Sequence, residues 1–168
     1  MVSEYDVNDM LVVKQSCIHN KGVFAKRQIP ADTKLIEYVG KIVTNAEADR
    51  IHAECIAKIK DGDSAKTYLF ELDDEHYIDG DVPENHAKFI NHSCNPNAEY
   101  RYDDGSIWIV SRRDVADGEE ITYNYGFELD EEFMEHPCCC GSENCVGYIL
   151  HEEYWPRLKE VISRSTKV

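Results

Sequence analysis

Long apolar runs are missing from this sequence of 168 residues. No stretch approaches the roughly 20 apolar residues that a transmembrane helix needs, so we expect neither a membrane span nor a membrane partner. A basic segment is missing from residues 1 to 10, which carry three acidic side chains and differ from a secretory signal peptide. We therefore expect a protein that works inside a cell.

The sequence also lacks a G-x-G-x-x-G loop and any segment in which strands alternate regularly with helices. A Rossmann-type nucleotide site is therefore not expected. Basic residues are scarce, because 18 Lys and Arg stand against 33 Asp and Glu, for a net charge of −15. Such a surface repels phosphate backbones, which argues against direct nucleic-acid binding, and it attracts basic peptides or proteins. Because the same charge also serves solubility alone, it needs independent support before it indicates a basic partner.

Short apolar segments separated by turn-forming residues predict a β-rich protein. Two hairpins are expected, one joining residues 67–72 to 76–79 and the other joining residues 100–102 to 107–110. The other expected strands are residues 10–13, 22–25, 34–39 and 120–123.

Helical spacing of apolar residues predicts one helix inserted between the strands. Thr44 or Asn45 can cap this helix, Glu47 lies three residues after Thr44, and the turn at residues 61–63 ends it. Elsewhere we expect one helical turn, an acidic loop and a short C-terminal helix, at residues 87–90, 128–136 and 152–163 respectively.

Cysteine is concentrated near the C-terminus, where four of the seven cysteines lie within eight residues. In an intracellular protein such a cluster indicates metal binding before disulfides. Cys138, Cys140 and Cys145 form a C-x-C-x4-C pattern whose thiolates can hold Zn²⁺, and a closed structural site needs a fourth ligand. The spacing leaves four candidates for that ligand, namely Cys94, Cys139, His136 and His151.

Four segments, taken in order, carry a resemblance to a known family. They are residues 19–25 with 36–40 downstream, residues 88–97, residues 118–126 and residues 138–149. The second contains Asn91-His92-Ser93-Cys94, and the third contains Tyr123-Asn124-Tyr125-Gly126. Together they resemble the SET-domain protein lysine methyltransferases that carry a cysteine-rich post-SET zinc segment. The resemblance covers residues 10–150, and the pre-SET cysteine array of some relatives is absent.

The resemblance implies a β-rich (α+β) fold. In this SET fold, several small sheets form around a pseudoknot, with one inserted helix and a C-terminal zinc loop followed by a short helix. The expected divisions are a SET domain at residues 9–127 with its helix at about 45–60, a post-SET zinc segment at 134–150, and a C-terminal helix and tail at 151–168.

The resemblance also implies a site. Backbone groups of Lys21, Gly22 and Val23 would line the site for S-adenosylmethionine, while Asn91 and His92 would hold the amino-acid and adenine ends of this cofactor. Tyr125 would be the catalytic tyrosine, also in contact with the cofactor, and three further tyrosines would line the channel for the target lysine, namely Tyr68, Tyr100 and Tyr123. Cys94 would join Cys138, Cys140 and Cys145 as the fourth ligand of a structural Zn²⁺.

The chemistry of lysine methylation accounts for these residue types. The target lysine must lose a proton before it attacks, because its free pKa is about 10.4. A dry aromatic channel lowers that pKa by desolvation, and the faces of tyrosine rings attract the incoming cation. The hydroxyl of Tyr125 can orient the amine, and the sequence leaves open whether Tyr125 or a chain of waters takes the proton.

Ordinary packing explains each of these residues when it is taken alone. Asn91 could cap a turn, and His92 could be a core histidine. Tyr123 and Tyr125 are expected to alternate along one strand and so to face the same side. Only the joint pattern favours a functional site.

Four residues depart from the common family pattern, namely Asn20 and Asn124 in place of glycine and aspartate, and Lys88 and Val146 in place of arginine. Asn20 tolerates a positive φ angle better than most residues, so its loop is expected to survive. Lys88 keeps the charge of an arginine but loses its bidentate fork. These departures bear on substrate preference, because none removes a chemical group that the reaction needs.

The resulting expectation is a protein-lysine N-methyltransferase that acts on a basic protein, with a histone tail as the leading candidate. It would work in the nucleus, on chromosomes or in the cytoplasm, or in a host cell if it is a secreted effector. The alternatives are a catalytically silent SET-fold adaptor that binds lysine-containing peptides and a plain zinc-binding interaction module.

Overall fold

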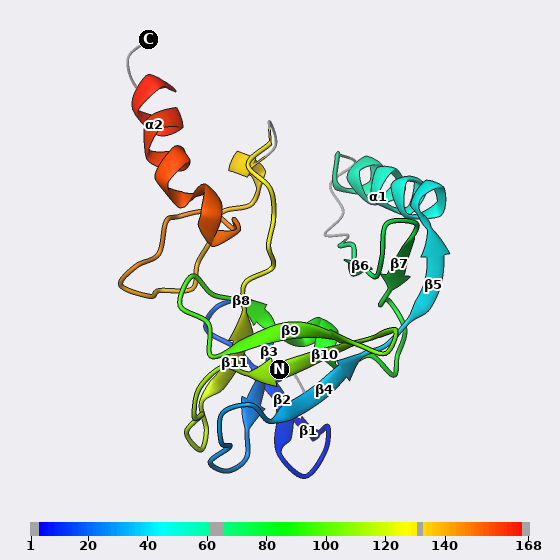
Figure 1. Cartoon of the computed structure of the whole chain (residues 1–168), viewed down its shortest axis with the longest axis vertical. Coiled ribbons are helices and arrows are strands. Elements are labelled where there is room, and N and C mark those ends of the chain that lie inside the picture. Colours follow the sequence, from blue (N-terminus) through cyan, green and yellow to red (C-terminus); the bar gives the residue numbers. More distant parts are fainter. Residues whose placement is uncertain (1–3, 61–65, 131–132, 166–168) are drawn as a thin grey trace. The chain divides into compact units, whose positions relative to one another are not determined.

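A computed structural model describes residues 4–60, 66–130 and 133–165, drawn in Figure 1. The chain forms two compact units, each built from separate stretches of sequence. The first contains residues 1–33, 90–99 and 111–168, and the second contains residues 34–89 and 100–110. Within the described ranges, neither long helix has the length and apolar composition needed to cross a bilayer.

The first unit contains a five-stranded sheet with the order β1-β2-β3-β11-β8. Its strands are β1 (Tyr5–Asp6), β2 (Leu11–Gln15), β3 (Lys21–Ala25), β8 (Asn91–His92) and β11 (Glu120–Tyr123). Apolar residues on the central strands are fully buried, among them Leu11, Val13, Val23 and Ile121. The neighbouring pairs β1–β2, β2–β3 and β3–β11 are antiparallel. The first two join consecutive strands through short connections, which antiparallel pairing permits.

The pair β8–β11 differs, because its strands are parallel. Asn91 lies opposite Thr122 and His92 lies opposite Tyr123. The N–H of Ser93 continues the ladder by donating to the carbonyl of Tyr123. This pairing brings the second and third family-like segments side by side, although the paired residues lie about 30 positions apart in the chain.

The second unit contains two three-stranded sheets. One has the order β4-β10-β9, and the other has the order β5-β7-β6. Their strands are β4 (Lys34–Tyr38), β5 (Lys41–Thr44), β6 (Leu69–Glu71), β7 (His76–Asp79), β9 (Ala98–Asp103) and β10 (Ser106–Ser111), and the last two extend into the first unit at Ala98–Glu99 and Ser111. Both predicted hairpins are confirmed, since β6 pairs with β7 and β9 neighbours β10. The second hairpin turns through Asp104 and Gly105, whose positive φ angles of 48° and 79° suit a tight β-turn.

The predicted inserted helix is α1 (Asn45–Lys60), which packs against β5 and β7 (Figure 1). Its N-terminus is a capping box. The backbone N–H of Thr44 donates to the Glu47 carboxylate at 3.0 Å, and the N–H of Glu47 donates to the Thr44 hydroxyl at 3.4 Å. The end predicted at residues 61–63 lies outside the described residues.

Three short elements and one helix complete the chain. They are the 3-10 turns η1 (Ala87–Phe89), η2 (Phe133–Glu135) and η3 (Glu152–Tyr154), followed by α2 (Trp155–Ser165). Phe133, Leu150 and Leu158 form a small buried cluster that covers one side of the C-terminal segment, and Val146 packs against it. An apolar residue at position 146 is therefore explained by packing, where the family pattern commonly has an arginine.

Some expectations need correction. The strands β1, β5 and β8 were not predicted, and β6 is shorter than the expected strand at 67–72. Tyr125 does not alternate with Tyr123 along one strand, because β11 ends at Tyr123. The side-chain oxygen of Asn124 accepts the N–H of Gly126, whose φ angle is 76°, and this turn directs the chain away from the sheet. The acidic loop expected at 128–136 contains η2, and residues 131 and 132 lie outside the described residues.

Candidate functional site: a four-thiol cluster beside a parallel strand pair

Four thiols meet in the first unit. The sulfur atoms of Cys94, Cys138, Cys140 and Cys145 all lie within 4.8 Å of one another. The Cys94 sulfur is 3.8 Å from that of Cys138 and 3.9 Å from that of Cys145. A tetrahedral zinc with bonds of about 2.3 Å to sulfur has edges of about 3.8 Å, so these separations fit Zn²⁺.

The structure also distinguishes the four candidates for the fourth zinc ligand. Cys94 is 3% exposed and belongs to the cluster, whereas Cys139 is exposed and does not. The ring of His136 packs against that of Phe127, with centroids 5.0 Å apart, and the ring of His151 accepts the backbone N–H of Glu153 at the start of η3. The geometry therefore favours Cys94, as the resemblance implied.

The thiols of the cluster differ in how readily they ionise without a metal. The pKa of Cys94 is raised to about 11, mainly by burial and to a smaller extent by the nearby sulfurs of Cys140 and Cys145. Burial raises the pKa of Cys138 as well. Burial opposes ionisation of Cys140, but hydrogen bonds from Ser142 and from backbone N–H groups lower its pKa to about 6. Four adjacent thiolates repel one another, so a metal ion is what would allow them all to ionise.

His92 connects the cluster with Tyr125. Its Nδ1 atom accepts the backbone N–H of Tyr125 at 3.2 Å, and its Nε2 atom lies 3.6 Å from the sulfur of Cys94. Because Nδ1 accepts, the ring proton belongs on Nε2 and faces the sulfur. Burial lowers the pKa of His92 to about 4, which keeps the ring neutral near pH 7. At its other end, Tyr125 donates its hydroxyl proton to the carbonyl of Ile90 at 2.9 Å.

Asn91 lies on the same parallel strand pair and contacts the first residue of β3. Its amide nitrogen donates to the carbonyl of Lys21 at 2.9 Å and to the carboxylate of Glu120 at 2.7 Å. Gly22 and Val23, the next residues of β3, are buried. Asn20 adopts a φ angle of 41°, which confirms that asparagine tolerates this loop conformation.

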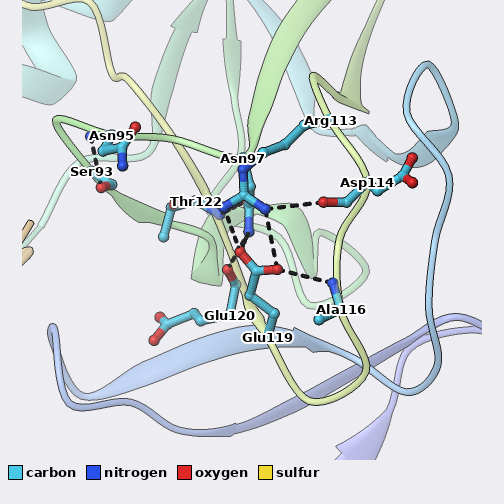
Figure 2. Close-up of polar contacts among 9 residues, drawn as sticks. All are labelled: Ser93, Asn95, Asn97, Arg113, Asp114, Ala116, Glu119, Glu120 and Thr122. Carbon is cyan, nitrogen blue, oxygen red and sulfur yellow. Dashed lines mark hydrogen bonds and ion pairs between the residues drawn. The ribbon is translucent and has the colours of Figure 1, made fainter.

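Asn97 is a structural centre that the sequence analysis missed. Figure 2 shows its side chain beside residues from the stretch between Arg113 and Thr122. Its amide nitrogen donates to Glu119 at 2.9 Å and to the carbonyl of Glu120 at 2.8 Å, while its oxygen accepts the N–H of Thr122 at 2.9 Å. Arg113 donates to the same Glu119 carboxylate at 2.6 Å. The position of Asn97, next to the second motif, was the only available signal, because hydrogen bonding across 25 residues leaves no periodic pattern.

Burial opposes ionisation of Glu119, yet hydrogen bonds from Arg113, the N–H of Ala116 and Asn97 lower the pKa of this carboxyl below its ordinary value. The charged carboxylate therefore holds the loop before β11 to Asn97. Thr122 of β11 lies opposite Asn91 of β8, so the hydrogen bonds of Asn97 also stabilise the pairing of these two strands.

The tyrosines predicted to line a channel fall in both units. Tyr123 and Tyr125 belong to the first unit, with ring centroids 5.0 Å apart. Tyr68 and Tyr100 belong to the second, where the carbonyl of Tyr68 accepts the hydroxyl of Tyr38 at 2.7 Å. A channel formed by all four remains a prediction.

Lys88, in the second unit, lies near the predicted tyrosine at position 68. Its ammonium group is 3.1 Å from the Asp81 carboxylate and 5.3 Å from the ring centroid of Tyr68. Burial raises the pKa of Tyr68, and the charge of Asp81 adds to this effect. Lys88 therefore keeps the positive charge of the arginine that is common at this position, but it contacts Asp81 through a single ammonium group.

Asn124 links the third family-like segment to the chain beyond the thiol cluster. Its amide nitrogen donates to the carbonyl of Leu150 at 3.1 Å. The N–H of His151 donates to the carbonyl of Phe127 at 2.8 Å, close to the same place. This hydrogen bond explains Asn124 at a position where the family often has an aspartate, because a carboxylate could not donate it.

The fold and the site together define a β-rich protein in which four cysteines from a C-terminal loop and the end of a parallel strand pair lie close together. A sequence profile described as SET domain matches residues 20–126. The chain belongs to the SET domain family.

Known relatives extend the similarity beyond the profile. Histone-lysine N-methyltransferase 2B of Homo sapiens is 36% identical over 141 residues, which cover 82% of this chain and 5% of the relative. Histone-lysine N-methyltransferase SETD1 of Drosophila melanogaster is 41% identical over 137 residues, 79% of this chain and 8% of the relative. An Aspergillus fumigatus relative named histone-lysine N-methyltransferase, H3 lysine-4 specific, is 39% identical over 140 residues, 80% of this chain and 11% of the relative. The chain therefore spans a small part of the length of these relatives.

Proposed function

We propose that this chain is an S-adenosylmethionine-dependent protein-lysine N-methyltransferase. The observation that carries the proposal is the parallel pairing of β8 with β11, which sets Asn91 and His92 beside Tyr123 and the turn that leads to Tyr125. Membership of the SET domain family and the names of the relatives support the same activity. The expected divisions at residues 9–127, 134–150 and 151–168 are part of this proposal.

S-adenosylmethionine would supply an electrophilic methyl group on a sulfonium. That methyl group would pass to a deprotonated lysine amine, whose proton Tyr125 or a chain of waters would accept. The protein contributes alignment and electrostatics, because the reaction requires no nucleophilic side chain. The backbone of Lys21, Gly22 and Val23, with Asn91 and His92, would hold the cofactor.

Tyr125 would be the catalytic tyrosine. Two hydrogen bonds fix it, one from its N–H to His92 and one from its hydroxyl to the carbonyl of Ile90. A hydroxyl held in this way is pre-organised to orient an incoming amine, and Tyr123 lies at ring-contact distance. Tyr68 and Tyr100 stay part of the proposal as further tyrosines that would line the channel for the target lysine.

The four-cysteine cluster would hold a structural Zn²⁺. Its donor set and its sulfur separations support this assignment. Because Cys94 follows β8 directly while the other three cysteines lie near the C-terminus, the ion would fasten the post-SET loop to the strand pair. His92 extends this connection to Tyr125.

The proposed substrate is a lysine of a basic protein, with a histone tail as the leading candidate. The net charge of −15 supports a basic partner through electrostatic steering. Histone modification would place the protein in the nucleus or on chromatin. These proposals come from the names of the relatives and the charge.

The decisive experiment measures transfer of tritiated methyl groups from S-adenosylmethionine into histones and other basic proteins. The wild-type protein should label a histone, and Tyr125→Phe should reduce the rate by at least about tenfold while leaving the fold intact by circular dichroism. Absence of labelling, together with absence of cofactor binding by calorimetry, would favour the adaptor.

The zinc assignment has a matched pair of variants in neighbouring residues. Cys138→Ser should lose the ion in metal analysis, loosen the C-terminal segment and lower methyl transfer, because structural zinc contributes directly to folding. Cys139→Ser should retain the ion, since Cys139 is exposed and outside the cluster. Equal zinc content in the two variants would contradict the assignment.

The hydroxyl of Tyr123 is expected to affect how many methyl groups the product lysine carries. We expect the hydroxyl of Tyr123 to narrow the channel and favour low methylation states, since this side chain is 7% exposed and touches Tyr125. Mass spectrometry should show more di- or trimethyl-lysine from Tyr123→Phe than from the wild type, and unchanged product states would reject the idea.

A further inference from the structure

A carboxylate with no assigned role lies beside Asn91. The Glu120 side chain accepts the Asn91 amide nitrogen at 2.7 Å and the Ser16 hydroxyl at 2.8 and 2.9 Å. Asn91 and Ser16 are 7% and 8% exposed, so these hydrogen bonds lie in a largely desolvated place. Three segments that are distant in sequence thus meet at one carboxylate.

The groups around the Asn91 nitrogen are acceptors. The carbonyl of Lys21 and the carboxylate of Glu120 have no proton to give, and both lie within 2.9 Å of that nitrogen. The Ser16 hydroxyl gives its proton to Glu120 and therefore also presents lone pairs to Asn91 at 3.2 Å. A flipped amide would place oxygen against oxygen, so this surrounding fixes one orientation of the amide.

That orientation has a consequence for cofactor binding. With its two N–H groups directed at Lys21 and Glu120, Asn91 turns its side-chain oxygen away from both. The oxygen is then set as an acceptor for a cationic donor, and the amino-acid end of S-adenosylmethionine carries an ammonium.

Gly22 provides the space for this carboxylate. A Cβ atom at position 22 would collide with the Glu120 carboxylate and approach the ring of Phe24 at 3.0 Å. Glu120 cannot easily move aside, because Ser16 and Asn91 hold it. The requirement for glycine at position 22 therefore follows from the side chains of Glu120 and Phe24.

We propose that Glu120 is a positioning residue that, with Ser16, orients the Asn91 amide to receive the amino-acid end of S-adenosylmethionine. The proposal rests on the proposed function. Glu120 acts through Asn91, and its removal should weaken cofactor affinity while leaving the affinity for the peptide substrate unchanged.

The test is calorimetric titration with S-adenosylmethionine and with its product S-adenosylhomocysteine. Glu120→Ala should raise both dissociation constants about tenfold, because the Asn91 amide loses a hydrogen bond that holds it in one orientation. Glu120→Gln keeps a side-chain carbonyl of equal reach and should recover most of the affinity. Glu99→Ala is the matched control, because Glu99 is a half-exposed glutamate in the same unit that pairs with Arg112, and it should bind as the wild type does.

A merely structural role gives a different pattern. It would lower the melting temperature and the active fraction of Glu120→Ala while leaving the dissociation constants of the folded protein unchanged, and a shift below twofold would overturn the proposal. Equal weakening in Glu120→Gln and Glu120→Ala would also overturn it, since orientation then would not matter. If Glu120→Ala fails to fold, Ser16→Ala decides, with an expected weakening of about threefold and no change as the contrary result. A wild-type protein that binds neither ligand would refute the proposed function itself.

Discussion

Replacing Asn97 by alanine should destabilise the protein by about 3 kcal/mol. The substitution removes three hydrogen bonds and leaves two backbone groups without their partner, the carbonyl of Glu120 and the N–H of Thr122. Each buried unsatisfied group costs about 1–3 kcal/mol, so the upper limit is near 6 kcal/mol. Water entering the space left by the side chain should recover part of this. Glu119 keeps its hydrogen bonds with Arg113 and with the N–H of Ala116, so losing Asn97 as a partner adds little to the loss of stability.

The assay is urea unfolding, followed by circular dichroism and analysed by linear extrapolation. Asn95→Ala is the matched control, because Asn95 is the same residue type two positions earlier and its side chain is exposed (Figure 2). It should change the free energy of unfolding by no more than about 0.5 kcal/mol. If Asn97→Ala and Asn95→Ala unfold at the same urea concentration, Asn97 does not hold the strand pair, and the reasoning is refuted.

Two further predictions concern the carboxylates of the same segment. Gly22→Ala should lower the free energy of unfolding by about 1–3 kcal/mol, because the new methyl group collides with Glu120. In a Glu120→Ala background, thermal unfolding should show a smaller loss of stability from the same substitution. An equal loss in both backgrounds would exclude the collision. Glu119→Gln should lower stability by about 1 kcal/mol at pH 7. Since folding lowers the pKa of Glu119 from 4.5, its contribution is present above that pH and is lost as the pH falls through the folded value, so urea midpoints of variant and wild type should converge in acid. A gap independent of pH would contradict this.

Local patterns made much of the fold predictable. Alternating and apolar segments identified both hairpins, and the spacing from Thr44 to Glu47 identified the capping box of α1. The cysteine spacing identified three members of the thiol cluster, because they lie in one short loop. These features depend on residues close together in sequence, where spacing carries the information.

The missing parts depend on long-range contacts. The two-residue strand β8 exists only because β11 lies beside it, and its sequence, Asn91-His92, has low strand propensity. Cys94 lies 44 residues from Cys138, so its membership of the cluster came from the resemblance and not from spacing. Asn97 and Glu120 were missed for the same reason, since their partners are distant in sequence.

The shortness of the parallel pair β8–β11 makes its register important. A slip of one residue would turn every side chain on the moved strand to the opposite face, so Asn91 and His92 would exchange sides together. Two residues of ladder give little energetic preference for one alignment over the next. The hydrogen bond from the N–H of Thr122 to Asn97 and the contact of His92 with Cys94 supply that preference from outside the ladder. Mutations at these supports could therefore yield a folded protein in which both motifs are present but misaligned, a defect that a melting curve alone would not reveal.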